Sequence, residues 1–253
     1  MNETRRRLLA SLSAAGAGAV LIGCRATPSG PSGQGSTGAT NDDGREPAPG
    51  EAVPEEVTAV EDLMREHGIL RRALMVYQES VVRLRQDAAS VPAEALEKTA
   101  QLFRVFGEDY HEQRLEEAYI IPMIKKVQGP VAIYADVLVA QHARGREITD
   151  YLLSVTKGER IAANQVDSVT KALESFVRMY DHHAAIEDTV IFPAWKKLTG
   201  EQEYNELGEK FEEIEHELFG EDGFESALRR MEEIESSLGL TNLEMFTAPP
   251  LPK

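Results

Sequence analysis

The sequence has little cysteine, a shortage of positive charge and no long apolar run, and each shortage excludes a class of protein. Its one cysteine, Cys24, can form neither a disulfide within the chain nor a cysteine-ligated metal site. Its 27 basic residues face 43 acidic ones, which argues against binding to nucleic acid because phosphates require a basic surface. The apolar stretch from Leu8 to Ile22 is shorter than the roughly 20 residues that span a bilayer.

The N-terminal segment resembles a bacterial export signal. Residues 4–9 (TRRRLL) resemble a twin-arginine motif, and residues 21–24 (LIGC) resemble a lipobox, in which the cysteine is lipidated after cleavage. We therefore predict a signal peptide over residues 1–23 and a lipid anchor on Cys24. The anchor would hold an exported protein on the periplasmic side of the inner or outer membrane. Residues 24–54, rich in Gly, Ser, Thr and Pro, predict a flexible linker after the lipidated cysteine.

From residue 55 onward, apolar residues recur at spacings of three and four, the period of amphipathic helices, and no segment alternates convincingly with period two. Breaks at Pro92, at Gly129-Pro130 and around residues 158–165 divide this pattern into four long helices. A charge-rich segment, residues 201–238, follows. We predict an all-α fold: an antiparallel four-helix bundle with an additional C-terminal helix over residues 55–246, and a tail over residues 247–253.

A pattern of histidine and carboxylate residues occurs twice, 71 positions apart. The first copy, YHEQRLEEAYIIPMIKKV, covers residues 110–127, and the second, DHHAAIEDTVIFPAWKKL, covers residues 181–198. Another histidine lies upstream of each copy, His67 before the first and His142 before the second. Four histidine-bearing segments in two tandem halves predict one metal site built from four helices.

Several buried histidines are costly without a cation, because burial strips them of water and protonated rings repel one another. Neutral imidazole and carboxylate groups both coordinate metals, and a set without sulfur suits iron, manganese or zinc. A pair of metal ions bridged by carboxylates would account for such a large number of candidate ligands. No side chain near the motifs makes an obvious nucleophile, or a general base separate from the metal ligands. The pattern therefore favours a metal-binding protein over an enzyme.

The order of these residues resembles the hemerythrin-like (HHE) cation-binding domain family, over roughly Thr58 to Phe246. The resemblance implies a four-helix bundle around a non-haem di-iron site, with two bridging carboxylates and histidines on each iron. A di-iron site with an open coordination position can bind or sense a small ligand such as O2 or NO, so we expect a role in oxygen or nitric oxide binding or sensing, in redox chemistry or in iron handling. The residues that match the family's ligands on the first and third helices and its bridging carboxylates are His67, His142, Glu116 and Glu187.

On the fourth helix, His183 is the better ligand candidate. It lies four residues before Glu187, within roughly 40° on a regular helix, whereas His182 lies roughly 140° away. On the third helix the oxygen-carrying members have a second histidine one turn from the first. Here Leu138 and Arg146 occupy those positions, so the sequence departs from the pattern of an oxygen carrier.

On the second helix the sequence leaves two alternatives open. The residue four positions before Glu116 is Glu112, and His111 lies five positions before it. Either Glu112 is the ligand on a regular helix, or a π-bulge turns His111 inward; both could also bind one metal. Glu117 and Asp188, which follow the two predicted bridging residues, are expected to be solvated or to orient ligands.

Two other functions compete with this interpretation. A ferritin-like carboxylate site needs Glu-x-x-His motifs, and Glu108 with His111 and Glu213 with His216 have that spacing. That site would leave the other histidines without a role. A metal-free, lipid-anchored interaction scaffold is compatible with the linker, the acidic surface and the C-terminal helix, but does not require the repeated ligand set.

Overall fold

The first long helix, α2 (Ala59–Gln86), begins at a capping box. Thr58 Oγ1 accepts a hydrogen bond from the backbone N–H of Glu61 at 3.3 Å, and Glu61 Oε2 accepts one from the N–H of Thr58 at 3.4 Å. The computed structural model describes residues 57–220 and 222–252. The predicted signal peptide, the lipidation site at Cys24 and the linker over residues 24–54 lie outside the described residues.

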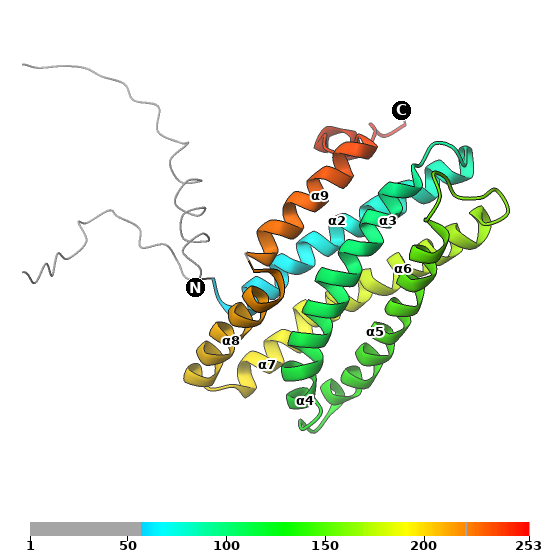
Figure 1. The fold of residues 1–253 in the computed structure, drawn as a ribbon. Helices are drawn as coiled ribbons and strands as arrows, with labels where there is room; N and C mark the ends of the chain where they lie inside the picture. Colours follow the sequence, from blue (N-terminus) through cyan, green and yellow to red (C-terminus); the bar gives the residue numbers. More distant parts are fainter. Residues whose placement is uncertain (1–56, 221, 253) are drawn as a thin grey trace, which may run out of the picture. The chain divides into compact units, whose positions relative to one another are not determined.

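Three further helical rods pack beside α2, and Figure 1 shows the four rods side by side. Every secondary-structure element in the described part of the chain is helical, which confirms the predicted all-α fold of a helical bundle with an extension. The second rod consists of α3 (Ala93–Leu102), the π-helix η2 (Phe103–Ile120) and α4 (Ile121–Ile124). The third rod is α5 (Pro130–Val155). The fourth rod consists of α6 (Val166–Ile186), the π-helix η3 (Glu187–Ile191) and α7 (Phe192–Leu198).

The second and fourth rods both contain a π-helical segment that ends just before a proline. The N–H of Ile121 bonds to the carbonyl of Glu116, and the N–H of Phe192 bonds to the carbonyl of Glu187, in each case five residues back. The next residue in each rod is a proline, which has no N–H with which to continue either hydrogen-bonding pattern. The repeated Glu and Pro six residues apart thus correspond to a repeated backbone feature.

Aromatic side chains form two layers, one on each side of the buried histidines along the rods. In one layer Tyr77 stacks on Phe103 with ring centroids 5.7 Å apart, and Phe176 meets Phe103 edge-on at 4.8 Å. In the other layer Trp195 stacks on Phe211 at 5.8 Å. Burial of each such ring stabilises the fold by about 2–3 kcal/mol. The histidines lie between these layers, so water reaches them poorly.

The C-terminal extension consists of α8 (Glu201–Phe219), α9 (Gly223–Leu238) and the short 3-10 helix η4 (Leu243–Phe246). Its helices α8 and α9 pack on the face of the bundle formed by α2 and the second rod. The segment predicted as one additional helix contains two long helices, and α8 ends where Gly220 adopts a left-handed φ of 65°. α9 is joined to α2 by the guanidinium of Arg72, which donates to the two carboxylate oxygens of Glu235 at 2.8 and 2.5 Å.

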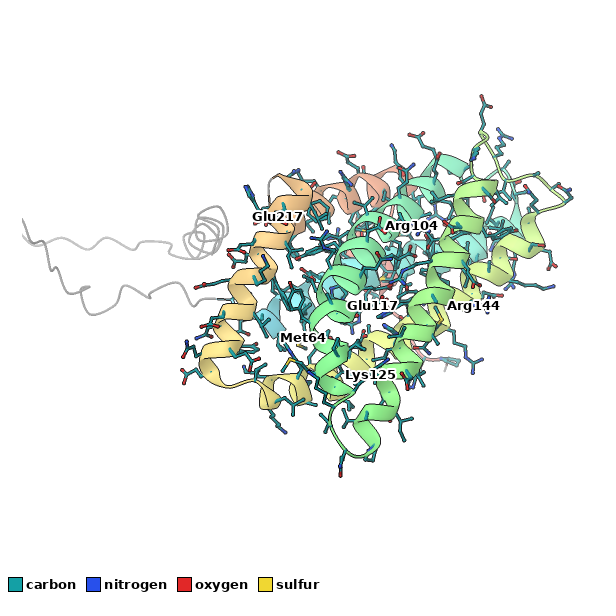
Figure 2. All side chains as sticks on the ribbon, turned by 60° about the horizontal axis from the view of Figure 1, so that its bottom comes forward. Met64, Arg104, Glu117, Lys125, Arg144 and Glu217 are labelled. Carbon is teal, nitrogen blue, oxygen red and sulfur yellow. The ribbon has the colours of Figure 1, made fainter. Side chains whose placement is uncertain are left out.

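Charged side chains dominate the exterior of the described domain. Figure 2 shows Lys125, Arg144 and Glu217 pointing away from the helices, and all three are substantially exposed. Among the described residues no helix has the length and apolar character needed to cross a membrane.

Candidate metal centre

Six side chains converge at the middle of the bundle, and each is at least 97% buried. α2 and η2 supply one pair of histidines, α5 and α6 supply the other pair, and the two π-helices supply the glutamates. The six are His67, His111, Glu116, His142, His183 and Glu187.

The first half of the cluster is formed by the histidines of α2 and η2. His67 Nε2 lies 3.0 Å from His111 Nε2. Glu116 Oε1 is 3.3 Å from His111 Nε2, and Glu187 Oε2 is 3.5 Å from His67 Nε2. Two ring nitrogens and one oxygen from each glutamate therefore face a common point, which we call the first position.

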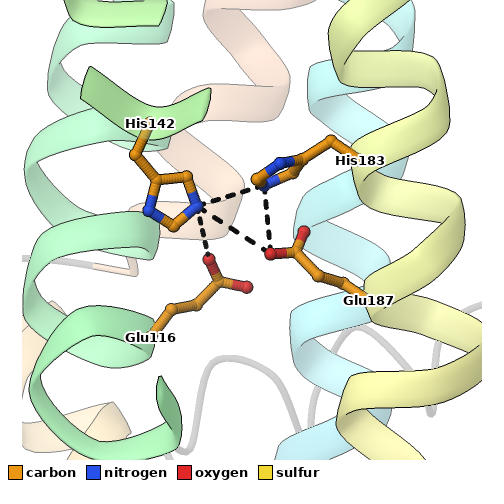
Figure 3. Close-up of side chains that lie close together, drawn as sticks. All are labelled: Glu116, His142, His183 and Glu187. Carbon is orange, nitrogen blue, oxygen red and sulfur yellow. Dashed lines mark hydrogen bonds and ion pairs between the residues drawn. The ribbon is translucent and has the colours of Figure 1, made fainter. Parts of the chain in front are cut away.

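The second half repeats this arrangement with the histidines of α5 and α6, as Figure 3 shows. His142 Nε2 lies 3.1 Å from His183 Nε2. Glu116 Oε2 is 3.3 Å from His142 Nε2, and Glu187 Oε1 is 3.0 Å from His183 Nε2. This second position therefore has the same donor set as the first, and each glutamate directs one oxygen to each position.

The chemistry of these atoms fits two cations. The four carboxylate oxygens of Glu116 and Glu187 are buried and face only imidazole Nε2 atoms, with no hydroxyl, amide or guanidinium donor among the described residues. A buried carboxylate that lacks hydrogen bonds costs several kcal/mol, so such atoms in a native core need an explanation. A bound cation at each position would pair all four oxygens at once. Nitrogen and oxygen donors without sulfur suit iron, manganese or zinc.

The ionisation of the same groups agrees with a site made for positive charge. Burial lowers the pKa of His111 and of His142, but the neighbouring carboxylates outweigh burial and hold each pKa well above its usual value. Burial raises the pKa of Glu116, yet the two histidines beside it pull that pKa well below its usual value. Protons on the rings thus substitute for cations, and metal binding must displace them.

A second layer of side chains fixes each imidazole through its other nitrogen. His67 Nδ1 lies 2.7 Å from Asp188 Oδ1, and His142 Nδ1 lies 2.9 Å from Glu117 Oε1. Each of these carboxylates also contacts an arginine that lies four residues after the histidine in the sequence. Asp188 contacts Arg71, and Glu117 accepts a hydrogen bond from Arg146 at 2.5 Å. Hydrogen bonds of this kind select the ring tautomer that leaves Nε2 free for a metal.

The other two histidines, His111 and His183, are held by the residues that directly precede His67 and His142 in the sequence. His111 Nδ1 lies 2.6 Å from Glu66 Oε2, and His183 Nδ1 lies 2.9 Å from Gln141 Oε1. Sequence reasoning did not single out Glu66 or Gln141. The available signal was their equivalent place, one residue before His67 and one before His142.

The structure brings His111 and Glu116 together through the π-helix, because i→i+5 bonding places residues five apart on one face. Glu112 is also buried, but its carboxylate accepts hydrogen bonds from Tyr180 at 2.5 Å and from Arg146 at 3.2 Å. It lies close to Glu117 and His142, where the Arg146 guanidinium already supplies a positive charge. On this helix the π-helical backbone turns His111 toward the cluster, and Glu112 is buried beside it in contact with Tyr180 and Arg146.

The remaining candidates lie apart from the cluster. His182 and His216 are exposed, and Glu213 pairs with Lys210 at the surface. Glu108 is fully buried, but its carboxylate accepts a hydrogen bond from Thr149 at 2.5 Å and not from the ring of His111. The Glu-x-x-His pairs of a ferritin-like site are therefore not assembled among the described residues.

A small cavity adjoins both metal positions, with His67 and His111 of the first and His183 of the second in its wall. Its space for a water-sized molecule is about 10 Å³, roughly enough for one. Part of its wall is made by ligand candidates and part by apolar side chains, with the Tyr180–Glu112 pair at its polar edge. Its lining includes His67, His111, Leu70, Leu74, Tyr180 and Glu187.

Comparison with known proteins assigns this arrangement to a family. Residues 58–195 match the hemerythrin HHE cation-binding domain. The chain is 41% identical over 244 residues to the uncharacterized protein Rv1995 of Mycobacterium tuberculosis, a match that covers 96% of this chain and 90% of the relative. It is equally similar to the uncharacterized protein Mb2018 of Mycobacterium bovis. No solved structure matches. With a family match over more than half of its length and a buried His/Glu cluster that fits a metal site, the chain belongs to the hemerythrin HHE cation-binding domain family.

Proposed function

We propose that this protein binds two iron ions, one at each position, and uses them to bind or sense a diatomic ligand, O2 or NO, or to handle redox equivalents or iron. The observation that carries the two-metal proposal is the set of four buried oxygens of Glu116 and Glu187, which face only imidazole nitrogens. Each residue spans the two positions, as a bridging carboxylate does. Iron bound there would supply redox chemistry and open coordination sites.

The size of the cavity beside the two positions supports a diatomic ligand. With space for roughly one water-sized molecule, it excludes larger organic substrates. Leu70 and Leu74 give it an apolar wall, which suits O2 or NO. The Tyr180 hydroxyl donates a hydrogen bond to Glu112 and thereby holds that carboxylate at the polar edge of the cavity.

Elemental analysis and ligand binding test this function directly. Protein produced with ample iron is expected to contain about two iron ions per chain. The anaerobically reduced protein is expected to change its absorption spectrum on addition of NO or O2. An iron content well below one per chain that does not fall further in His67→Ala and His142→Ala variants would refute the proposal. Recovery of zinc alone, with a silent spectrum, would refute the diatomic ligand.

We propose further that the protein acts in the cell envelope. The support is in the sequence: the twin-arginine motif, the lipobox ending at Cys24 and the linker over residues 24–54. Fractionation of wild-type cells is expected to place the mature protein in the membrane fraction with a lipid on Cys24. If a Cys24→Ser variant fractionates in the same way with an intact N-terminus, the protein has no lipid anchor at this position.

A further inference from the structure

The two metal positions have the same inner donors but different supports. Of the four imidazole Nδ1 atoms, three face a carboxylate and one faces an amide oxygen. At the first position both histidines face carboxylates, Asp188 for His67 and Glu66 for His111. At the second position His142 faces Glu117, whereas His183 faces the neutral Gln141.

The Nδ1 partners of His67 and His142 are alike, so the imidazole partners of the two positions differ in kind only at Glu66 and Gln141. Asp188 and Glu117 occupy equivalent places, and each is neutralised in part by an arginine. Glu112, the additional buried carboxylate near His142, accepts hydrogen bonds from Tyr180 and Arg146.

Glu66 directs a buried negative charge at His111. Its side chain is 1% exposed, and its Oε1 accepts a hydrogen bond from the neutral Tyr110 hydroxyl at 3.0 Å. Its Oε2 lies 2.6 Å from His111 Nδ1, shorter than the 2.9 Å between Gln141 Oε1 and His183 Nδ1. An imidazole that donates Nδ1–H to a carboxylate is a stronger electron donor at Nε2 than one that donates to an amide.

We propose that Glu66 and Gln141 make the two positions unequal, so that the first position, held by His67 and His111, binds a divalent transition metal about tenfold more tightly than the second. The inference rests on the proposed two-metal function. It makes Glu66 and Gln141 positioning residues that set the order in which the positions fill.

Titration of the metal-free full chain with cobalt(II), followed by its visible absorption, tests this inference. The wild type is expected to bind two cobalt ions in two resolved steps whose affinities differ about tenfold. Gln141→Glu should tighten the weaker step, and Glu66→Gln should weaken the tighter one, so that each change brings the two affinities together. Glu108→Gln, which alters a buried carboxylate that pairs with Thr149 and Arg104 and not with an imidazole, should leave the difference in place.

Histidine variants assign the steps, because His67→Ala should remove the tighter step and His142→Ala the weaker one. Two cobalt ions bound with equal affinities would overturn the inequality while leaving the two-metal function intact. Unequal affinities that neither exchange changes would overturn the roles of Glu66 and Gln141. Fewer than two ions at saturation would instead refute the proposed function. Helical content measured by circular dichroism verifies that each variant is folded, and the two near-isosteric exchanges should preserve it.

Discussion

In the half of the centre formed by α2 and η2, the histidine and glutamate of the second rod are five residues apart on a π-helix. In the half formed by α5 and α6, they are four residues apart, and the π-helix begins only at the glutamate. The side chains nevertheless reach equivalent places, with His111 against Glu116 at 3.3 Å and His183 against Glu187 at 3.0 Å. The two repeats can thus differ in helix period and still direct their histidine and glutamate side chains into equivalent places.

Removal of a bridging carboxylate should have the largest effect, because it disables both halves together. Glu116→Ala or Glu187→Ala withdraws one oxygen from each position, so we expect bound iron to fall from about two ions per chain to fewer than one. His67→Ala should cost one ion. Glu117→Gln, which changes only a second-layer partner of His142, should retain most of the metal. Elemental analysis after gel filtration measures all four variants. Equal retention in Glu116→Ala and Glu117→Gln would exclude the bridging role.

Gly145→Ala should have the next largest effect, a loss of stability, because the two halves of the centre have different residues at this position. The position four residues past Gln141 is Gly145, and the one four past Glu66 is Leu70. A Cβ on Gly145 would overlap the ring of Tyr180, with Cζ at 2.9 Å, and that ring is buried and held by Glu112. We expect a loss of about 1–3 kcal/mol in the free energy of unfolding, measured by urea denaturation.

Gly68→Ala is the matched control for Gly145→Ala. Gly68 is also a helical glycine, but a Cβ there would have no neighbour within 4 Å. The substitution should therefore stabilise the protein by about 0.5–1 kcal/mol, the usual gain from alanine in a helix. Equal effects of the two substitutions would show that Tyr180 can move aside.

Glu108, a buried carboxylate present in the first half alone, should make the free energy of unfolding depend on pH. Burial, and to a smaller extent Glu112, raises the pKa of Glu108 to about 7 against the opposing effects of Thr149 and Arg104. A folded-state pKa above the unfolded value means that this group favours folding fully below about pH 4.5. The contribution is lost as pH rises through about 7, and amounts to at most about 3 kcal/mol.

Glu108→Gln should remove that dependence. The amide stays neutral and can still accept the hydrogen bond from Thr149, so the variant should be more stable than wild type at pH 8 and similar to it at pH 4.5. Urea denaturation at the two pH values measures the difference. A stability change of the same size and sign at both would show that Glu108 does not hold its proton in the folded protein.

The smallest effect should come from Tyr180→Phe, which breaks a link between the two halves. Tyr180 belongs to α6 but fixes Glu112 of η2, beside the cavity. Loss of a hydrogen bond of about 1 kcal/mol should change the NO dissociation rate of the reduced, iron-loaded protein by roughly fivefold, measured by stopped flow. Tyr77→Phe is the control, because the Tyr77 hydroxyl is buried without a partner and does not line the cavity. A similar rate change in both variants would remove Tyr180 from the ligand site.

The helical bundle could be predicted from the sequence because the signals are local. The capping residues Thr58 and Glu61, the break at Gly129 and the apolar spacing of three and four act within a few residues, and they place the helices where the structure has them. The repeat of 71 positions likewise indicated that two rods present the same residues to one centre.

The sequence by itself thus determined the fold class, the family and a shared histidine–glutamate pattern. Only the tertiary structure decided that His111 turns inward, since the choice between an α and a π turn depends on what the opposite rod presents. It alone paired Glu66 with His111 and Gln141 with His183, contacts between residues 45 and 42 positions apart. The physical reason is that a side chain's hydrogen-bond partner is set by packing between helices, which the period of one helix does not encode.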